Sequence, residues 1–450
     1  MDISKIVNQQ KSFFNSNSTK EVNLRIETLK KLKHILKKNE DRLYTAIYDD
    51  FKKSAFETYI AELSLIYNEL NDAIRNLKKW SKQKRVRTNL ANFPAKSYII
   101  PEPLGTVLVI SAWNYPYQLA LIPAISAIAA GNTVVIKPSE IPNNTSKVLA
   151  QLINANFNEN HLTVIEGDVA TTTELLQQKW DKIFFTGSTP VGKIIYKAAA
   201  ENLTPVTLEL GGKSPVAVFE DADQENALNG ITAGIFGASG QSCIAGSRLY
   251  LQKNIYNSFL DKLVNRSNKI KLGNPMDSDT QMGPLSSLKQ LEIIEKNIKL
   301  TVDQGGKIKC GGKRHTLSNK GYYFPATIME CKNHNLPTAE NELFGPVLSV
   351  MKFETEEEVI NKMNDNQYGL SSGVYTKDLG RGLRVSKAIR AGITFVNTYR
   401  LISPSAPFGG MKDSGYGNEA GIESIKDYTR IKTTWFNTSE KPMSDPFTMG

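Results

Sequence analysis

The spacing of apolar residues predicts amphipathic helices in residues 1–80. The leucines recur at intervals of three, four, five and seven, with lysines between them: Leu24, Leu29, Leu32, Leu36 and Leu43. Such spacing puts the leucines on one helix face and the lysines on the solvated face. Acidic residues follow soon afterwards, so we interpret these helices as packed on a larger body and not as lying on a membrane.

From Gly105 the pattern changes to short β-branched runs that alternate with helical stretches. The predicted strands are 106–110, 133–136, 162–165, 182–185 and 206–210, with helices at 124–130, 146–154 and 191–200. This order predicts a parallel sheet covered on both faces, the doubly wound arrangement. A second series follows after Gly212, with strands near 249 and at 347–353, 372–375 and 393–396, and helices at 255–270 and 356–363. We therefore expect two α/β domains.

Composition indicates an ordinary globular protein. Of the 450 residues, 40% are hydrophobic and 22% charged, near the usual proportions for water-soluble domains. The net charge of +10 is spread along the chain without a recognition motif, so no nucleic-acid partner is expected. The longest apolar run, 119–130, is shorter than the ~20 residues that span a bilayer. Three scattered cysteines and no apolar leader favour a reducing compartment, the cytoplasm.

A glycine turn at 184–193 predicts a phosphate site. Gly187 and Gly192 lie between a predicted strand and a predicted helix, where backbone N–H groups and the helix terminus receive phosphate oxygens. The turn is no triphosphatase P-loop, because Ile194 stands where a hydroxyl would hold magnesium. It also lacks the Gly-x-Gly-x-x-Gly dinucleotide fingerprint. The alternative is an ordinary strand-to-helix turn.

Glu209 and Cys243 are candidates for a base and a nucleophile. A carboxyl group between leucines at a strand end acquires the raised pKa of a useful base, although it could equally form a structural ion pair. Cys243 lies among small residues beside a glycine, where the alternative is a small buried apolar side chain. None of the four histidines lies in a motif, which favours Glu209 as the partner.

Six sequence blocks carry a family resemblance. They are Trp113-Asn114-Tyr115-Pro116, Lys137-Pro138-Ser139-Glu140, Leu208-Glu209-Leu210-Gly211-Gly212-Lys213, Gly240-Gln241-Ser242-Cys243, Glu342-Leu343-Phe344-Gly345-Pro346, and Pro407-Phe408-Gly409-Gly410 with Lys412, Ser414 and Gly415. In this order and spacing they resemble the NAD(P)-dependent aldehyde dehydrogenase superfamily. The N-terminal part is similar to the dimeric class for long-chain and aromatic aldehydes, whereas the blocks at Cys243 and Pro407 look more like tetrameric members.

The resemblance implies an enzyme that oxidises an aldehyde to a carboxylic acid. Cys243 would attack the aldehyde carbon, Asn114 and the Cys243 N–H would stabilise the oxyanion, and Glu209 would deprotonate the water that hydrolyses the thioester. For Asn114 the alternative is a residue that only closes a turn. Transfer of the acyl group to coenzyme A, hydrolysis without nicotinamide, and a non-catalytic binding role are further alternatives.

The resemblance also implies NAD as the cofactor, with NADP as an additional possibility and no metal. Gly187, Ser188 and Gly192 would bind the pyrophosphate, and Lys137, Ser139 and Glu140 the adenosine ribose. Glu342 would hold the nicotinamide ribose, and Phe344, Trp113, Leu210 and Gly211 would line the site. The alternatives are that Lys137 and Glu140 are solvated charges of a surface loop and that Glu342 is a helix-capping or loop carboxylate.

By the same resemblance, the aldehyde channel is lined by Tyr115, Leu119, Ile122, Ser242, Ile244, Ile402 and Phe408. These residues include no Arg or Lys, so we expect an aliphatic or aromatic aldehyde and not a semialdehyde acid. The alternative is that several are core residues.

The implied architecture is a Rossmann-type cofactor domain (1–84 and 104–211), an α/β catalytic domain (212–427) and a small β oligomerisation element (85–103 and 428–437). Residues 428–435 alternate as an edge strand does, which predicts a homodimer, or a homotetramer as a dimer of dimers.

Overall fold

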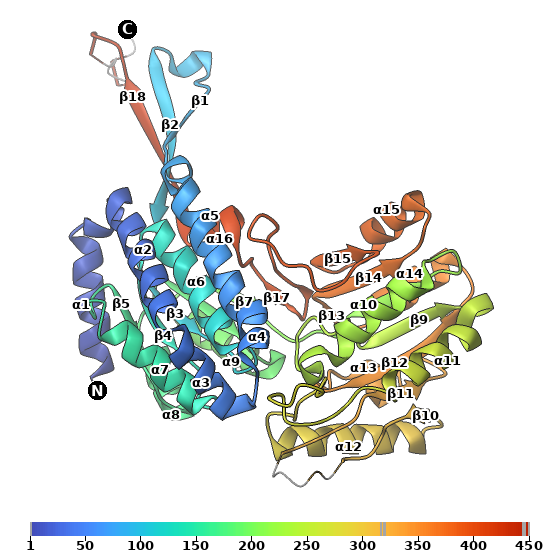
Figure 1. Ribbon diagram of the computed structural model, residues 1–450. Helices are drawn as coiled ribbons and strands as arrows, with labels where there is room; N and C mark the ends of the chain where they lie inside the picture. The colour runs from blue at the N-terminus through green and yellow to red at the C-terminus, as the bar shows by residue number, and fades with distance from the viewer. Residues whose placement is uncertain (1, 316, 318–320, 443–446, 449–450) are drawn as a thin grey trace.

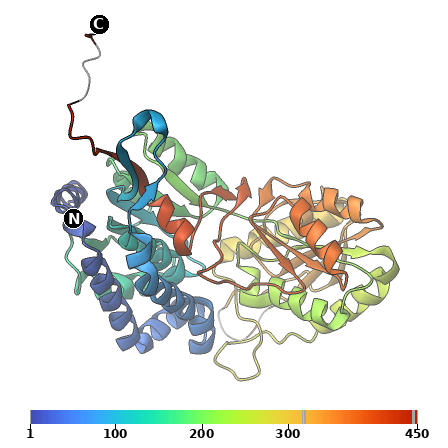
Figure 2. The same cartoon turned by 90° about the horizontal axis from the view of Figure 1, so that it is seen from above.

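Two α/β bodies lie side by side, and a narrow β arm projects from one of them (Figures 1 and 2). The computed structural model describes residues 2–315, 317, 321–442 and 447–448. Within these residues, no helix combines the length and the apolar character that a bilayer crossing requires.

The first body is built on a six-stranded sheet in the order β17-β7-β6-β3-β4-β5. Five strands are parallel, and β17 runs antiparallel to β7. Their bounds are β3 Thr106–Ile110, β4 Thr133–Lys137, β5 Leu162–Val164, β6 Lys182–Thr186, β7 Val206–Glu209 and β17 Gly415–Tyr416.

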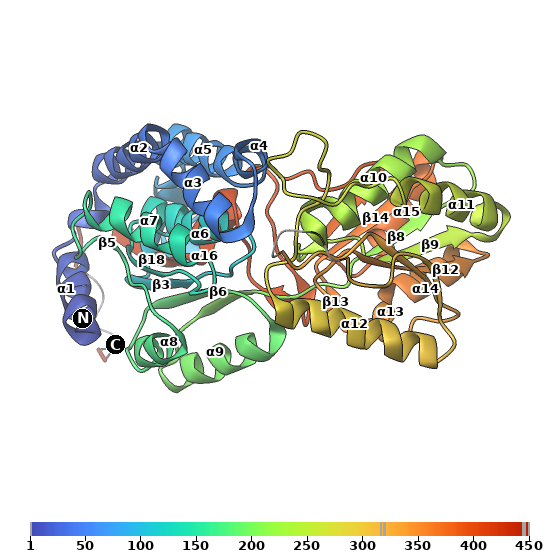
Figure 3. The same ribbon diagram turned by 60° about the horizontal axis from the view of Figure 1, so that its bottom comes forward.

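Helices cover both faces of this sheet, as doubly wound folds require (Figure 3). One face packs on α2 (Val22–Lys38), α3 (Glu40–Phe51), α5 (Ser64–Trp80), α6 (Pro116–Ala130) and α7 (Asn143–Asn154). The other face packs on α1 (Ile3–Asn15), α8 (Val169–Leu176) and α9 (Thr189–Glu201). Helix α6 is apolar all round and almost wholly buried, because it lies between the sheet and the outer helices.

The second body holds a seven-stranded sheet in the order β10-β11-β12-β9-β8-β14-β15, in which only β10 is antiparallel. Its strands are β8 Pro215–Val218, β9 Arg248–Gln252, β10 Lys307–Cys310, β11 Thr327–Glu330, β12 Val347–Phe353, β14 Ser371–Tyr375 and β15 Ile393–Val396. The main helices of this body are α10 Gln224–Phe236, α11 Tyr256–Ser267, α12 Leu288–Asp303, α14 Glu356–Asn364 and α15 Leu379–Ala388. The two faces have separate cores, one against α10 and α11 and one against α12, α14 and α15.

The arm is a three-stranded antiparallel sheet of β1 (Lys84–Val86), β2 (Ala95–Pro103) and β18 (Thr429–Asn437). β18 pairs with β2 along its whole length. Before it reaches the arm, the chain adds β17 to the first sheet and forms α16 (Gly421–Asp427). The C-terminal segment therefore contributes to both the first body and the arm.

The predicted α/β fold class is confirmed. Several elements of the second body were not predicted, namely β8, β10, β11, α10, α12 and α15. Among the predicted elements, the main differences lie at helix ends. The helix expected at 124–130 begins at Pro116, because Pro123 is accommodated inside it. The helix expected at 255–270 runs from Tyr256 to Ser267.

Candidate active site

A cavity of about 1390 Å³ lies between the two bodies. The carboxyl ends of β3, β4, β6 and β7 open into it from the first sheet, where doubly wound folds bind their ligands. The second body contributes the turn around Cys243 and the loops at 342–344 and 400–402. Every residue predicted to act in catalysis, cofactor binding or substrate binding lines this cavity, except Gly192.

The β6–α9 turn has the features of an anion cradle. Ser188 is the N-cap of α9, and its side chain makes no capping hydrogen bond, which leaves the first helical N–H groups for a ligand. A Cβ on Gly187 would collide with the ring of Phe185. A Cβ on Gly192 would lie 2.6 Å from Cδ2 of Leu210, so this glycine lets α9 pack close to the strand that follows β7.

Lys137, Ser139 and Glu140 lie together where β4 ends. The Lys137 Nζ is 3.4 Å from Oε2 of Glu140; the lysine side chain is 3% exposed and the glutamate 48%. Burial lowers the pKa of Lys137, and the Glu140 charge opposes that shift. The Ser139 hydroxyl accepts the Ile141 N–H. A buried ammonium beside a half-exposed carboxylate suits hydroxyl groups that both donate and accept.

Glu342 and two aromatic rings form the next part of the wall. Glu342 Oε1 accepts the Gly212 N–H at 2.9 Å, and a Cβ on Gly211 would collide with the same carboxylate. Burial raises the pKa of Glu342 to about 7. The rings of Trp113 and Phe344 meet edge to face at 5.4 Å, and Phe344 has a left-handed φ of 50°.

Glu209 is the last residue of β7 and is 3% exposed. Neither of its carboxyl oxygens has a hydrogen-bond partner among the described residues. Burial raises the pKa of Glu209 well above its usual value, and the charges of Glu419 and Asp427 add to the shift. Glu209 is therefore a buried carboxyl group that is free to exchange a proton within the cavity.

Asn114 and Cys243 approach each other across the two bodies. The Asn114 side chain donates to the carbonyl of Gln241 at 3.2 Å, two residues before the cysteine. Burial raises the pKa of the Cys243 thiol, and the charges of Glu342, Glu209 and Glu419 act in the same direction. The side-chain amide of Asn114 is thus an N–H donor held against the turn that carries the partly exposed Cys243.

Comparison with known proteins identifies the family. The family model described as "Aldehyde dehydrogenase family" matches residues 1–434. The chain belongs to the aldehyde dehydrogenase family. It is 41% identical over 430 residues to (Z)-2-((N-methylformamido)methylene)-5-hydroxybutyrolactone dehydrogenase of Acinetobacter baylyi, covering 94% of this chain and 86% of that protein. It is 35% identical to 4,4'-diaponeurosporen-aldehyde dehydrogenase of Staphylococcus aureus, covering 95% and 92%.

Solved aldehyde dehydrogenases share the fold. A substrate-bound structure of Staphylococcus aureus AldH has a TM-score of 0.91 and 34% identity, covering 99% of this chain and 96% of that one. Betaine aldehyde dehydrogenase of Staphylococcus aureus, in complex with NAD+, has a TM-score of 0.92 and 32% identity, covering 98% and 90%. The predicted family and enzyme class are confirmed: the chain is an aldehyde dehydrogenase, with a nicotinamide dinucleotide as its cofactor.

The substrate side of the aldehyde dehydrogenase cavity differs from the sequence prediction in its charge. All seven predicted channel residues line the cavity. These seven residues include no Arg or Lys, but two further residues of the same cavity wall, Arg400 and Lys53, do carry a positive charge. Arg400 donates to the Tyr115 hydroxyl at 2.8 Å, and the Lys53 Nζ lies 4.6 Å from the centre of the Tyr115 ring. Arg400 directly precedes Leu401 and Ile402 in the sequence. An inspection of the charged residues next to the predicted channel residue Ile402 would therefore have identified Arg400 as a wall residue.

Sequence reasoning also missed two buried carboxyl groups. Glu419 lies close enough to Glu209 to raise its pKa, and burial raises the pKa of Glu419 itself to about 8. Glu62 accepts backbone N–H groups at the start of α6. Nothing in the residues around either glutamate signals burial, since the contacts come from distant parts of the chain.

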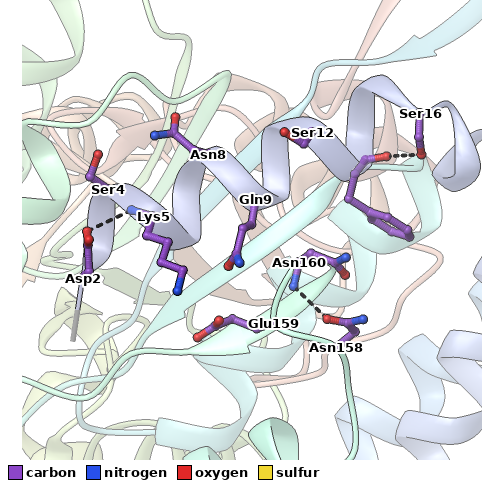
Figure 4. A pocket seen from close by; sticks show the side chains of 11 residues that line it. Asp2, Ser4, Lys5, Asn8, Gln9, Ser12, Ser16, Asn158, Glu159 and Asn160 are labelled. Atoms are coloured by element: carbon purple, nitrogen blue, oxygen red, sulfur yellow. Dashed lines mark hydrogen bonds between the residues drawn. The ribbon is translucent and has the colours of Figure 1, made fainter.

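A second hollow lies away from these residues, where α1 meets residues 158–160 (Figure 4). Most of its lining side chains are polar, and the hydrogen bonds drawn there are local: Lys5 N–H to Asp2, Ser16 Oγ to the Phe13 carbonyl, and Asn160 N–H to Asn158. None of the predicted site residues lines it.

Proposed function

We propose that Cys243 is the nucleophile, Asn114 the oxyanion donor and Glu209 the general base of an NAD-preferring aldehyde dehydrogenase. The observation that carries this proposal is that the thiol, an amide donor and an unpartnered carboxyl group line one cavity at the carboxyl edge of the first sheet. This is the minimum set for acyl formation and hydrolysis on a thiol.

The first half of the reaction forms a bond between Cys243 Sγ and the aldehyde carbon. As the sulfur attacks, the thiol proton passes to the Glu209 carboxylate and from there to solvent. The carbonyl oxygen becomes an oxyanion that receives hydrogen bonds from Asn114 and from the Cys243 N–H. A nicotinamide held by the residues around Ser188 and Glu342 would supply the acceptor for the hydride on the former aldehyde carbon. Cys243 then carries a thioester.

In the second half, Glu209 takes a proton from water, and the hydroxide adds to the thioester carbon. The C–S bond breaks, the carboxylic acid leaves, and the thiol group returns to its starting state. A buried base with free oxygens is what this step needs. It favours water as the acyl acceptor, ahead of coenzyme A.

The cofactor residues fit a dinucleotide. The uncapped start of α9 and the close glycines of its turn support a pyrophosphate site. Glu140 would accept hydrogen bonds from the adenosine ribose, with Lys137 and Ser139 beside it. A carboxylate there disfavours the 2′-phosphate of NADP, so we propose preference for NAD with weaker use of NADP.

The apolar wall beside Cys243 supports an aliphatic or aromatic carbon skeleton in the substrate. Leu119, Ile122, Ile244, Ile402 and Phe408 supply that wall.

We place the enzyme in the cytoplasm on the strength of its free cysteines, and assign the arm to assembly of a homodimer or a dimer of dimers. Residues 1–84 with 104–211 would be the cofactor domain and 212–427 the catalytic domain.

Replacement of the proposed nucleophile tests the mechanism. Cys243→Ala should abolish NADH formation from any aldehyde while NAD binding, measured by calorimetry, stays within about twofold, because only the thiol is removed. Cys331→Ala is the matched control, since that buried thiol is not among the residues that line the cavity. Aldehyde oxidation that survives in the Cys243 variant would refute the assignment.

A further inference from the structure

Arg400 places a cation without a carboxylate partner in the wall of the substrate cavity. Its Nη2 donates to the Tyr115 hydroxyl at 2.8 Å and its Nη1 to the Ala233 carbonyl at 3.2 Å. A guanidinium group has five N–H donors, so these bonds leave most of them available. In the described part of the chain, Arg400 forms no ion pair. It is half-buried and lines the cavity.

The guanidinium is bonded to a residue next to the proposed oxyanion donor. Tyr115, which it bonds, directly follows Asn114, the proposed oxyanion donor. Leu401 and Ile402, which follow Arg400, also line the cavity. A substrate that reaches Cys243 past this wall therefore passes the guanidinium.

A second cation lies on the same tyrosine. The Lys53 Nζ is 4.6 Å from the centre of the Tyr115 ring and donates to the Asn114 carbonyl at 2.6 Å. Lys53 has a carboxylate neighbour, Glu62, at 3.9 Å. Glu57 lines the cavity too and contributes to raising the pKa of Glu62, which places it on the Lys53 side. Arg400 is thus the cation of this wall whose charge is left uncompensated.

The backbone holds Arg400 in an unfavourable conformation. Its φ is 61°, in the left-handed region, and Asn397 in the same loop has a φ of 56°. An arginine in this region is strained, and such strain is retained where the surrounding structure fixes a side chain for a purpose. The two hydrogen bonds to Tyr115 and Ala233 fix the guanidinium before any ligand arrives, which reduces the entropy lost on binding.

We propose that Arg400 is a specificity residue that binds an anionic group of the substrate, so that the preferred aldehydes carry a carboxylate on the far end of an aliphatic or aromatic skeleton. This inference rests on the proposed function of Cys243. Guanidinium pairs with carboxylates through two parallel hydrogen bonds. The same charge repels aldehydes with a quaternary ammonium group.

Three para-substituted benzaldehydes of similar shape test the proposal: the 4-carboxy, the 4-methyl and the 4-trimethylammonio compounds. The wild-type enzyme should show kcat/KM at least tenfold higher for the carboxy than for the trimethylammonio compound, and the difference should shrink as salt is raised. Arg400→Gln should lower the carboxy-to-methyl ratio of kcat/KM about tenfold or more, mainly through KM for the carboxy compound. Arg400→Lys should retain part of the preference.

Arg390→Gln is the matched control, because it removes the same charge from an exposed residue that is not among those lining the cavity. A carboxy-to-methyl ratio that Arg400→Gln leaves unmoved, or a wild-type enzyme without charge preference, overturns the inference. If Arg400→Gln does not fold, the wild-type preference and the Arg400→Lys ratio decide alone.

Binding separates this inference from the proposed mechanism. In the Cys243→Ala background, calorimetry with the 4-carboxy compound should give a Kd about tenfold weaker when Arg400→Gln is added. Loss of affinity without any wild-type turnover would support the anion site and refute the proposed function. If the wild type oxidises the methyl compound normally and Arg400→Gln leaves the affinity for the carboxy compound unchanged, the anion site is refuted and the proposed function stands.

Discussion

At the scale of single residues, Glu209 stands out because folding buries its carboxyl group and gives it no partner. Such burial favours the neutral form, which is why its pKa rises. The unfolded chain releases this proton near pH 4.5, whereas the folded chain keeps it to higher pH. Its contribution to the free energy of unfolding is therefore largest below pH 4.5 and declines as pH rises through the folded pKa.

Glu209→Gln should separate the chemical role from that stability effect. The amide cannot take a proton, so hydrolysis of the thioester should slow by about 10²–10⁴-fold, and a burst of NADH should precede a slow steady state. The melting temperature of the variant should exceed that of the wild type at pH 8 more than at pH 5. Stopped-flow absorbance and thermal unfolding at both pH values measure these effects. Glu340→Gln, on an exposed residue, is the control, and an unchanged steady state would make Glu209 structural.

Glu140 should decide the cofactor. Glu140→Gln removes the charge that would repel a 2′-phosphate but keeps a side chain that bonds a hydroxyl, so the NADP-to-NAD ratio of kcat/KM should rise about tenfold. Steady-state kinetics with both cofactors measure the ratio, and Glu201→Gln at the end of α9 is the control. A wild type that already favours NADP would contradict the placement of the adenosine ribose.

At the scale of elements, the start of α6 shows how a distant segment completes a site. Pro116 at the first helical position has no N–H, and Tyr115 at the N-cap makes no side-chain cap. Glu62 Oε2 accepts the N–H groups of Tyr117 at 2.7 Å and Gln118 at 3.2 Å instead. Lys53, beside Glu62, bonds the Asn114 carbonyl. The position of Asn114 thus depends on two residues from the N-terminal helices.

Lys53→Met should remove the hydrogen bond to the Asn114 carbonyl and so make the position of the Asn114 side chain less fixed. We expect kcat to fall about tenfold, less than the loss of an oxyanion donor itself, and to fall little further in an Asn114→Ala background, because the lysine acts through that residue. The double-mutant cycle on kcat measures the coupling, and Lys52→Met is the matched neighbour. Additive losses in the cycle would assign Lys53 a general structural role.

The sequence predicted elements well where a local pattern specifies them. The predicted strand 106–110 is observed as β3. Its five consecutive apolar or β-branched residues are all buried, as expected of a strand covered on both faces of the sheet. The start of α6 was not predicted, since Glu62, which accepts its first N–H groups, meets it only in the folded chain. The five-residue π-helical segment Tyr59–Leu63 was not predicted either. The site residues within motifs were found together. Lys53 and Glu419 were missed because only tertiary contacts bring them to the cavity, whereas Arg400 was missed although it lies two residues before the predicted channel residue Ile402.

At the scale of the whole molecule, the arm presents an edge strand to solvent. In the order β1-β2-β18, one side of β18 has no pairing partner within the described chain. Ile431, Trp435 and Phe436 on this strand are 74%, 53% and 52% exposed. An exposed apolar edge strand favours association with a second chain.

Charges on β18 should prevent that association. Ile431→Lys combined with Trp435→Lys should shift the sedimentation coefficient from that of a dimer or tetramer to that of a monomer at micromolar concentration. Leu203→Lys, at an exposed apolar residue of the first body, should leave assembly intact. A wild-type chain that sediments only as a monomer would refute the assignment of the arm.

The antiparallel pairing of β17 with β7 has a consequence for biosynthesis. Because Gly415 lies opposite Glu209 and the Ser414 carbonyl accepts the Leu210 N–H, the edge of the first sheet closes only after the ribosome has reached Gly415, long after it has made β7. During translation β7 is an open edge. A nascent or prematurely terminated chain can thus assemble much of the first body while the carboxyl group of Glu209 remains at an unsealed edge, and such a chain is a natural client for chaperones.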